Sequence, residues 1–337
     1  MEGTRLRIGI VGASSLLGKE LAEELGSSVL AAAEVALLDE EEAAGQLTSL
    51  GDEASFIRSV EPSAFSGLDL VFFAGTADQA RKYGPEAVKA GIAVIDLTTA
   101  LRGEAGAIVR SPWIAEAQGA GSLMNLGTSV VIPAHPVVVM LGLVGARCTR
   151  LGVNLMAATV LVPASERGQA GMDEMHQQTV NLLSFQSLPQ EEFDAQVAFN
   201  LLPSLGIAAK VGMDETAARI EGEYRAAGRL PELTLQLVQA PVFHGYAASV
   251  MLEAGARMPA SEIVAALAGE HIDLPEEDEV PSNVSAAGQG DVMVRVKSGA
   301  SRRMWLWLAT DNLKLTALHA IACAVELVSL RPKGIVQ

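Results

Sequence analysis

The stretch that decides the fold is IGIVGASSLLGKEL, residues 8–21. Residues 8–11 are apolar apart from one glycine, which is typical of a buried β-strand, and the apolar spacing over residues 16–25 predicts a helix. Between them lies a turn that begins at Gly12 and ends at Gly18. Glycine lets backbone N–H groups approach a phosphate closely, and a helix N-terminus carries about half a positive charge. The stretch therefore predicts a strand–turn–helix unit that can bind a dinucleotide.

The turn and the end of the next predicted strand supply the candidate cofactor-binding residues. Asp39 lies 21 residues after Gly18, where a carboxylate can accept hydrogen bonds from ribose hydroxyls. Three glutamates follow at 40–42 without a basic residue, so a 2′-phosphate would be repelled. We expect NAD rather than NADP, although a solvated acidic turn explains the glutamates equally well. The turn residues in question are Gly12, Ser14, Ser15, Leu16, Leu17 and Gly18.

Beyond this unit, short apolar runs alternate with amphipathic helical ones, which indicates a doubly wound, Rossmann-like parallel sheet. After Pro133 the pattern changes to that of a second, α+β domain. We place the first domain at 1–133 plus 311–337 and the second at 134–310. Strands are expected at 35–38, 70–74, 93–95 and 151–161, helices at 79–90, 137–146, 171–183 and 313–330, and a loop at 274–284.

Composition narrows the function classes. The 337 residues include 40 acidic and 24 basic ones, a net charge of −16, and half of the chain is hydrophobic. Such a surface repels nucleic acid and anionic membranes. The longest apolar run, 130–146, contains two prolines and is a poor membrane span, and the N-terminus does not resemble a signal peptide. We expect a cytoplasmic protein with buried free thiols at Cys148 and Cys323 and no metal site.

The chain resembles the aspartate-semialdehyde dehydrogenase family, most closely its Usg-type branch, over nearly its whole length. Each matching segment is weak, but their order along the chain is specific. The resemblance implies a dinucleotide domain, a substrate and dimerisation domain that forms a homodimer, and a last helix that returns to the first domain. The segments are Gly12–Gly18, Ala74–Gly75, Asp96–Arg102, Ile132–Met140, Pro163–Gly171, Ala198–Pro203, Gln239–Tyr246 and Asp311–Leu313.

The reactive groups of that family are replaced in this chain. The family's cysteine nucleophile lies in an Asn-Pro-Asn-Cys segment, which corresponds to residues 132–135, so His135 stands in place of the thiol. The family's acid–base histidine follows Pro-Val-x-x-Gly, which corresponds to residues 241–246, so Tyr246 stands in place of the imidazole. A tyrosine with a pKa near 10 is a poor base at neutral pH. The nearby His244 is interpreted as a structural histidine.

The cation positions are also changed. Gln239 corresponds to the family's arginine seven residues before the histidine, and Ala217 corresponds to its lysine. Arg102 alone matches a family cation, one that binds phosphate. The glycine-rich loop near the nicotinamide reads Ser-Glu-Arg-Gly at 165–168. By the resemblance, Gly75, Ser165, Gly168 and Asn312 are further cofactor-binding candidates.

Two functions follow as alternatives. In the first, the chain is a catalytically altered or inactive family member that keeps a nucleotide pocket and acts by binding a small molecule or a partner. In the second, it is an NAD-dependent oxidoreductase on another small aldehyde or acyl substrate, in which His135, Tyr246 and Arg102 have new roles. Gln239 completes the set of candidate catalytic residues. Because the replaced groups act as one unit, their joint loss favours the first alternative.

Overall fold

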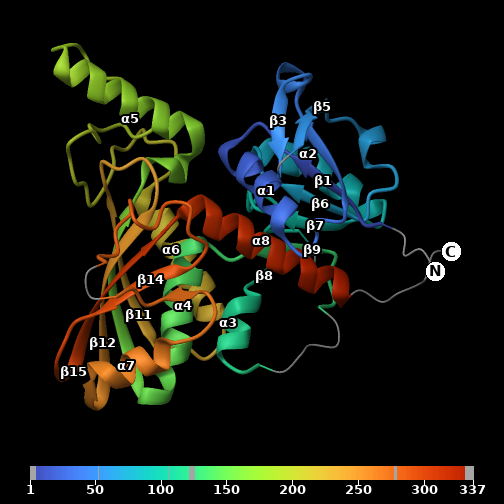
Figure 1. Cartoon of the computed structure of the whole chain (residues 1–337). Coiled ribbons are helices and arrows are strands. Elements are labelled where there is room, and N and C mark those ends of the chain that lie inside the picture. The colour runs from blue at the N-terminus through green and yellow to red at the C-terminus, as the bar shows by residue number, and fades with distance from the viewer. Residues whose placement is uncertain (1–4, 52, 105, 121–125, 277–278, 331–337) are drawn as a thin grey trace. The chain divides into compact units, whose positions relative to one another are not determined.

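A computed structural model of the chain describes residues 5–51, 53–104, 106–120, 126–276 and 279–330 (Figure 1). The chain forms two compact units. Unit 1 comprises residues 1–112, 120–134 and 316–337, and unit 2 comprises 113–119 and 135–315. Residues 113–119, which the predicted division placed in the first domain, thus belong to unit 2, and the last helix enters unit 1 at residue 316.

Unit 1 is built on a sheet of seven parallel strands in the order β5-β2-β1-β6-β7-β9-β8. A small antiparallel hairpin, β3 and β4, stands apart from it. The strands are β1 (Arg7–Val11), β2 (Glu34–Asp39), β3 (Leu47–Leu50), β4 (Glu53–Phe56), β5 (Arg58–Ser59), β6 (Leu70–Phe73), β7 (Ala93–Asp96), β8 (Ile108–Arg110) and β9 (Val130–Pro133).

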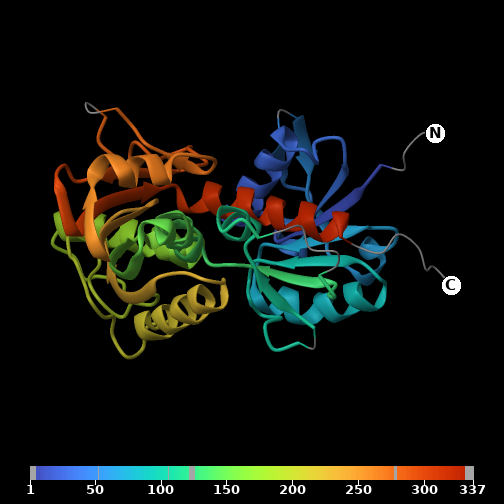
Figure 2. The ribbon, with the colours of Figure 1, turned by 90° about the horizontal axis from the view of Figure 1, so that it is seen from below.

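Helices cover both faces of this sheet (Figure 2). Side chains alternate along a strand, so Ile8 and Ile10 pack against α1 (Leu16–Ser27) and α8 (Asn312–Ser329), whereas Val11 faces α2 (Ala77–Lys89). Helix α8 is long and apolar enough to cross a membrane by length and composition, but half of it is buried against the sheet and α1. This two-sided packing is the predicted doubly wound fold.

A bidentate ion pair fastens α8 to the edge of the sheet. The guanidinium of Arg110 donates to Glu326 through Nε at 2.8 Å and through Nη2 at 2.6 Å. Burial opposes the charge of Arg110, but the hydrogen bonds to Glu326 prevail and raise the pKa of the guanidinium. The pair joins two residues that are 216 positions apart in the sequence.

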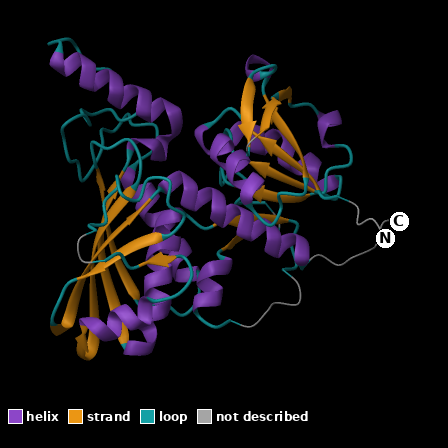
Figure 3. Cartoon of the chain, in the orientation of Figure 1, coloured by secondary structure: helices purple, strands orange, loops and turns teal. Residues whose placement is uncertain are grey.

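Unit 2 is a six-stranded, mostly antiparallel sheet in the order β11-β10-β12-β15-β14-β13, with helices on one side of it (Figure 3). Its strands are β10 (Val153–Val162), β11 (Glu232–Gln239), β12 (Tyr246–Pro259), β13 (Ile272–Asp273), β14 (Val292–Val296) and β15 (Ala300–Thr310). The helices are α3 (Pro112–Ala117), α4 (Pro136–Cys148), α5 (Gly168–Leu183), α6 (Met213–Ala226) and α7 (Ala260–Leu267), and short 3₁₀ turns lie at Glu41–Ala43, Pro62–Phe65, Thr149–Leu151 and Ala164–Arg167.

The two faces of the unit 2 sheet differ in what covers them. Met304, Leu306 and Leu308 of β15 are buried in the core, whereas Trp305 and Trp307 on the opposite face are 48% and 36% exposed within the single chain. The sequence predicted a sheet buried in a core or an interface. One face meets that expectation in the core, and the other lies open.

The predicted elements are present, with shifted ends. Helix α2 begins at Ala77 instead of 79 because Thr76 and Gln79 form a capping box. Helix α5 begins at Gly168 instead of 171. The described part of the predicted loop 274–284 contains neither helix nor strand, and residues 277–278 lie outside the described residues.

Two glycines with similar backbone conformations, Gly12 and Gly45, allow a test of how closely the first turn packs against the turn at Gly75. Gly12 and Gly45 both have left-handed backbones, with φ of 85° and 83°, but a Cβ at Gly12 would lie 2.1 Å from Gly75 Cα, whereas a Cβ at Gly45 would meet nothing within 4 Å. We expect Gly45→Ala to cost about 1–2 kcal/mol of unfolding free energy through φ strain. Gly12→Ala should cost about 1–3 kcal/mol more through overpacking. Urea unfolding measures both, and equal losses would contradict the proposed close contact.

Candidate functional site

The glycine turn of unit 1 is closed by its own serines. Ser15 is the N-cap of α1, since its Oγ accepts from the Gly18 N–H at 2.9 Å. The same hydroxyl donates to the Ala74 carbonyl at the end of β6, at 2.8 Å. Ser15 lies where a G-x-x-G-x-x-G turn would have its middle glycine. Its hydroxyl therefore joins two neighbouring βα turns. Leu16 and Leu17, two further candidates, form the first residues of α1.

Asp39 is the anchor of this turn. The side chain is buried and accepts from the N–H of Ser14 at 2.8 Å, the N–H of Glu40 at 2.9 Å and Nε2 of Gln79 at 2.9 Å. Burial raises the pKa of Asp39, but the hydrogen bonds outweigh it and lower that pKa below its ordinary value. Oδ2 receives only one of these three bonds, so it retains capacity for a ligand hydroxyl.

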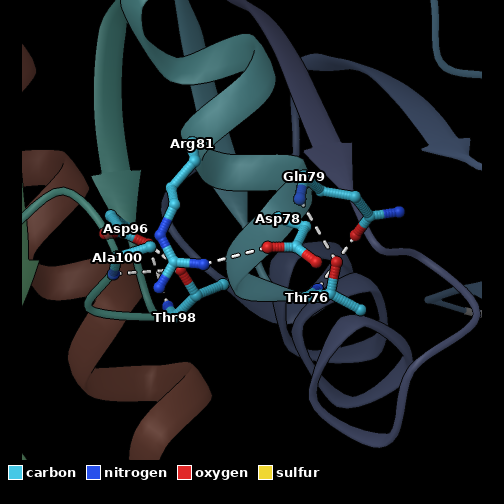
Figure 4. A network of polar contacts seen from close by, with 7 residues as sticks. All are labelled: Thr76, Asp78, Gln79, Arg81, Asp96, Thr98 and Ala100. Atoms are coloured by element: carbon cyan, nitrogen blue, oxygen red, sulfur yellow. Dashed lines mark hydrogen bonds and ion pairs between the residues drawn. The ribbon is translucent and has the colours of Figure 1, made fainter.

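The second βα turn of unit 1 packs directly on the first (Figure 4). Gly75 lies against Gly12, and Thr76 and Gln79 bond each other's backbone N–H groups at 3.2 and 2.9 Å. Because Gln79 also donates to Asp39, the two turns form one rigid unit. Sequence reasoning missed Gln79, although T-x-x-Q at 76–79 is a recognisable capping box.

A tightly organised turn follows β7, with Asp96, Thr98 and Ala100 close together (Figure 4), and Arg102 comes two residues later in the sequence. The carboxylate of Asp96 is fully buried and accepts from the Thr98 N–H at 2.9 Å, the Thr98 hydroxyl at 2.6 Å and the Leu101 N–H at 2.8 Å. These bonds fix the backbone that carries Arg102. The turn residues, Asp39, Gly75 and Arg102 belong to unit 1. The other predicted site residues belong to unit 2: His135, Ser165, Gly168, Gln239, Tyr246 and Asn312.

In unit 2, His135 and Tyr246 meet at one carboxylate. His135 is the N-cap of α4, and its Nδ1 accepts from the Val137 N–H at 3.1 Å. The neutral ring therefore carries its proton on Nε2, which lies 2.9 Å from Oε1 of Glu166. The Tyr246 hydroxyl donates to the other oxygen, Oε2. Glu166 thus bridges His135 and Tyr246.

The bridging carboxylate is held ionised. Burial raises the pKa of Glu166, but the hydrogen bonds from His135 and Tyr246 and the positive charge of Arg219 hold it well below its ordinary value. Burial first, and then the negative charge of Glu166, raise the pKa of Tyr246 well above its ordinary value. At neutral pH neither the Glu166 carboxylate nor the Tyr246 hydroxyl is a useful base.

A second carboxylate, that of Glu223, hydrogen-bonds the backbone N–H of His135. Glu223 on α6 is buried and accepts from the His135 N–H at 2.7 Å. Arg219 lies one helical turn earlier on the same helix, and its charge acts on Glu166 and Tyr246. Helix α6 therefore supplies both an anchor and a cation. Sequence reasoning assigned no role to Glu223 or Arg219 and named Glu166 only as part of the Ser-Glu-Arg-Gly loop at 165–168.

The remaining unit 2 candidates form a neighbouring polar cluster. Asn312 Oδ1 accepts from the Gly245 N–H at 2.8 Å and lies 3.2 Å from Ser165 Oγ. Ser165 and Gly245 directly precede Glu166 and Tyr246, so this cluster positions the bridge. Gly168 ends the same short turn with φ of 64° and begins α5. His244 lies just before β12, outside the strand.

Gln239 is committed to the backbone. It is fully buried, and its Nε2 donates to the carbonyls of Val162 at 3.0 Å and Ala240 at 3.3 Å. Its Oε1 meets no hydrogen-bond donor among the residues that the structure describes. Within those residues, no group of three or more His, Cys, Asp or Glu side chains could hold a metal ion. Burial raises the pKa of the Cys148 thiol to about 12, which makes it a poor nucleophile.

A doubly wound parallel domain with a glycine turn after β1, joined to an α+β domain, defines a two-domain protein of the NAD(P)-dependent dehydrogenase class. The chain belongs to the semialdehyde dehydrogenase family. Residues 7–132 match the family described as "Semialdehyde dehydrogenase, NAD binding domain", and residues 149–315 match "Semialdehyde dehydrogenase, dimerisation domain". The predicted family and fold class are confirmed, and an NAD(P)-binding domain and a dimerisation domain are present.

Individual relatives agree with this assignment. The chain is 30% identical over 327 residues to a USG-1 protein homolog of Pseudomonas aeruginosa, covering 94% of this chain and 96% of that one. It is 25% identical over 337 residues to an aspartate-semialdehyde dehydrogenase of Rickettsia conorii, covering 96% and 98%. A solved structure of a probable aspartate-semialdehyde dehydrogenase from P. aeruginosa superposes with a TM-score of 0.83 at 28% identity, covering 96% and 99%.

The hydrogen bonds from His135 and Tyr246 to the Glu166 carboxylate, which we call the bridge, predict how the free energy of unfolding depends on pH. The depressed pKa of Glu166 stabilises the fold above the ordinary glutamate pKa of 4.5, and this stabilisation is lost as pH falls through the depressed pKa. Glu166→Gln should therefore be about 1.5–3 kcal/mol less stable than the unmodified protein at neutral pH. The difference should shrink below pH 4.5. Urea unfolding across this range measures it.

The control for this measurement is Glu191→Gln, which changes an exposed glutamate of the same unit. We expect it to unfold like the unmodified protein at every pH. A Glu166→Gln penalty that stays constant from neutral pH to about 2 would contradict the ionised bridge.

Proposed function

We propose that this chain is a catalytically inactive member of the semialdehyde dehydrogenase family that acts as a dimeric, cytoplasmic nucleotide-binding protein. One observation carries the proposal: the carboxylate of Glu166 bonds both His135 and Tyr246. Chemistry at this place needs a free nucleophile and a base near neutral pKa. Each candidate group is engaged in the bridge instead.

His135 does not take over as nucleophile in this arrangement. Nδ1 accepts from the backbone and Nε2 carries a proton, so neither ring nitrogen offers a free lone pair. Release of the Nε2 proton would need an acceptor, but Glu166, whose pKa is depressed, is too weak a base and Tyr246 remains protonated. The imidazole acts here as a hydrogen-bonded cap of α4.

Substrate anchoring is weakened as well. The amide donors of Gln239 are used by two backbone carbonyls, so this residue does not replace an arginine that would hold a carboxylate. Ala217 offers no cation where the family has a lysine. Each lost charge-assisted contact costs about 1.5–3 kcal/mol of binding.

We expect no phosphorylating oxidation of aspartate semialdehyde by the unmodified protein, measured as NADH or NADPH formation in the presence of phosphate. His135→Cys alone should remain inactive, because base and cations are still missing. The combination of His135→Cys, Tyr246→His, Gln239→Arg and Ala217→Lys should recover a trace of activity. Addition of Glu166→Ala should raise that trace by freeing the new imidazole.

The control for the assay is His176→Cys, which adds a thiol on α5, away from residue 135 in the sequence. Turnover by the unmodified protein that His135→Ala abolishes would overturn the proposal. It would establish the alternative, an oxidoreductase that uses His135 in a new role.

For the cofactor, we propose NAD rather than NADP. Support comes from Asp39, whose ionised carboxylate lies at the end of β2 with capacity left on Oδ2, and from the following glutamates at 40–42, which would repel a 2′-phosphate. Charge-assisted hydrogen bonds from ribose hydroxyls to Asp39 would contribute about 1.5–3 kcal/mol.

Calorimetry should accordingly find NAD binding at least about tenfold tighter than NADP binding. Asp39→Asn should narrow the difference, whereas Glu42→Gln, at an exposed position three residues on, should have a much smaller effect. Thermal unfolding of both variants controls for loss of the Ser14 contact. Tighter NADP binding would contradict the assignment.

For the assembly, we propose a homodimer formed through the open face of the unit 2 sheet. Besides the two tryptophans, this face carries apolar or small residues of β10 and β12 such as Ala157 and Met251, which no helix within the described residues covers. Obligate interfaces commonly bury about 2,000 Å² or more. Light scattering should give twice the chain mass at micromolar concentration, and a stable monomer would contradict the dimer.

A further inference from the structure

An unusual set of apolar side chains lies on α5 and the loop that follows it. We call residues 168–211 the arm; Figure 1 shows α5 standing beyond the ends of the unit 2 strands. Five of its large apolar side chains are more than half exposed, and Phe185 is 99% exposed. Soluble proteins rarely leave such a group uncovered without a binding role. The five residues are Leu183, Phe185, Phe199, Leu201 and Ile207.

The loop of the arm is nevertheless firmly held. Glu174, Gln178 and Asn181 follow helical spacing along one face of α5, and each bonds loop backbone. The Glu174 carboxylate accepts from the backbone N–H groups of residues 192 and 193, at 2.6 and 3.2 Å. The Gln178 side chain donates to the backbone carbonyls of residues 189 and 195, at 2.8 and 2.9 Å. The Asn181 side chain donates to the backbone carbonyl of residue 187 at 2.6 Å. The exposed side chains are therefore displayed by an ordered scaffold.

Two of the displayed phenylalanines have strained backbones. Phe185 and Phe199 have φ of 56° and 59°, in the left-handed region that bulky residues avoid. Glycine or asparagine would allow the same loop path at lower cost. The retention of exposed aromatic rings at such positions is explained if the rings contact a partner.

A surface of complementary character lies on the β14–β15 hairpin of the same unit. Trp305 and Trp307 are exposed there beside Arg295 and Lys297, around a shallow hollow of about 570 Å³. Trp307 is fixed by a hydrogen bond from Nε1 to the Pro281 carbonyl at 2.9 Å. The face carries the basic residues Arg295 and Lys297, besides Arg303, which pairs with Glu253 on the neighbouring strand. The arm carries the exposed acidic residues Asp173 and Glu191, besides Glu192, which pairs with Lys210, and Glu174, which is buried.

We propose that the arm of one copy docks on the β14–β15 face of a second copy, and that the partner's arm returns the same contact. This inference rests on the proposed homodimer and names the surfaces that select the partner. Opposite charges on the two surfaces orient them, and the aromatic rings of both are buried on contact. In a two-fold dimer each such contact occurs twice.

Three paired variants test the docking. The arm variant is Phe185→Ser with Phe199→Ser, and the face variant is Trp305→Ser with Trp307→Ser. The control is Val29→Ser with Phe56→Ser, which removes two apolar side chains of unit 1 that are 82% and 65% exposed. Sedimentation equilibrium should show at least tenfold weaker dimerisation for the arm and face variants and less than a twofold change for the control.

A mixing experiment distinguishes reciprocal docking from simple loss of apolar surface. A heterodimer of one arm-variant chain and one face-variant chain keeps one intact arm–face contact, whereas each variant homodimer keeps none. The equimolar mixture should therefore dimerise more tightly than either variant alone.

The possible results separate the two proposals. Wild-type dimerisation that the arm variant leaves unchanged would overturn the docking but not the dimer. The docking is also overturned if mixing gives an affinity between those of the two variants. A monomeric wild type would overturn the dimer, and the docking with it. Thermal unfolding of each variant verifies that it is folded.

Discussion

A buried carboxylate keeps its charge only where hydrogen-bond donors replace the water that it has lost. Glu166 meets this requirement with a ring N–H and a phenol, and its side chain is only 20% exposed. The surrounding structure is consistent with this need: His135 is fixed by the start of α4, Ser165 and Gly245 are tied to Asn312, and Arg219 adds a positive charge. Removal of any one donor would leave a charge without its full solvation.

Under the proposed correspondence of His135 and Tyr246 to the family's thiol and imidazole, this arrangement explains why the two positions differ together. A histidine and a tyrosine are poor replacements for a thiol and an imidazole in catalysis, but both are good neutral donors to a carboxylate. Glu166 is stabilised by hydrogen bonds from both His135 and Tyr246. The three residues are therefore best understood as one structural unit rather than as three separate losses.

Local patterns made much of unit 1 predictable. The strand–turn–helix at residues 8–21, the buried strands and the closing helix depend on neighbouring residues, so their positions were correct within a few residues. The bridge at Glu166 joins residues 31 and 80 positions apart, and nothing in the spacing of 135, 166 and 246 indicates that they meet. The exposure of Trp305 was also beyond prediction, because β-strand alternation identifies two faces but not which one is covered.

The last helix has a consequence for how the protein matures on the ribosome. The apolar core between β1, α1 and α8 includes Ile10 near the start of the chain and Leu327 near its end. All of unit 2 is synthesised between these two residues. The nucleotide domain therefore emerges first but lacks one of its covering layers until α8 has been synthesised. During that interval its apolar face is open to chaperones, and a chain truncated before α8 would leave that face exposed permanently.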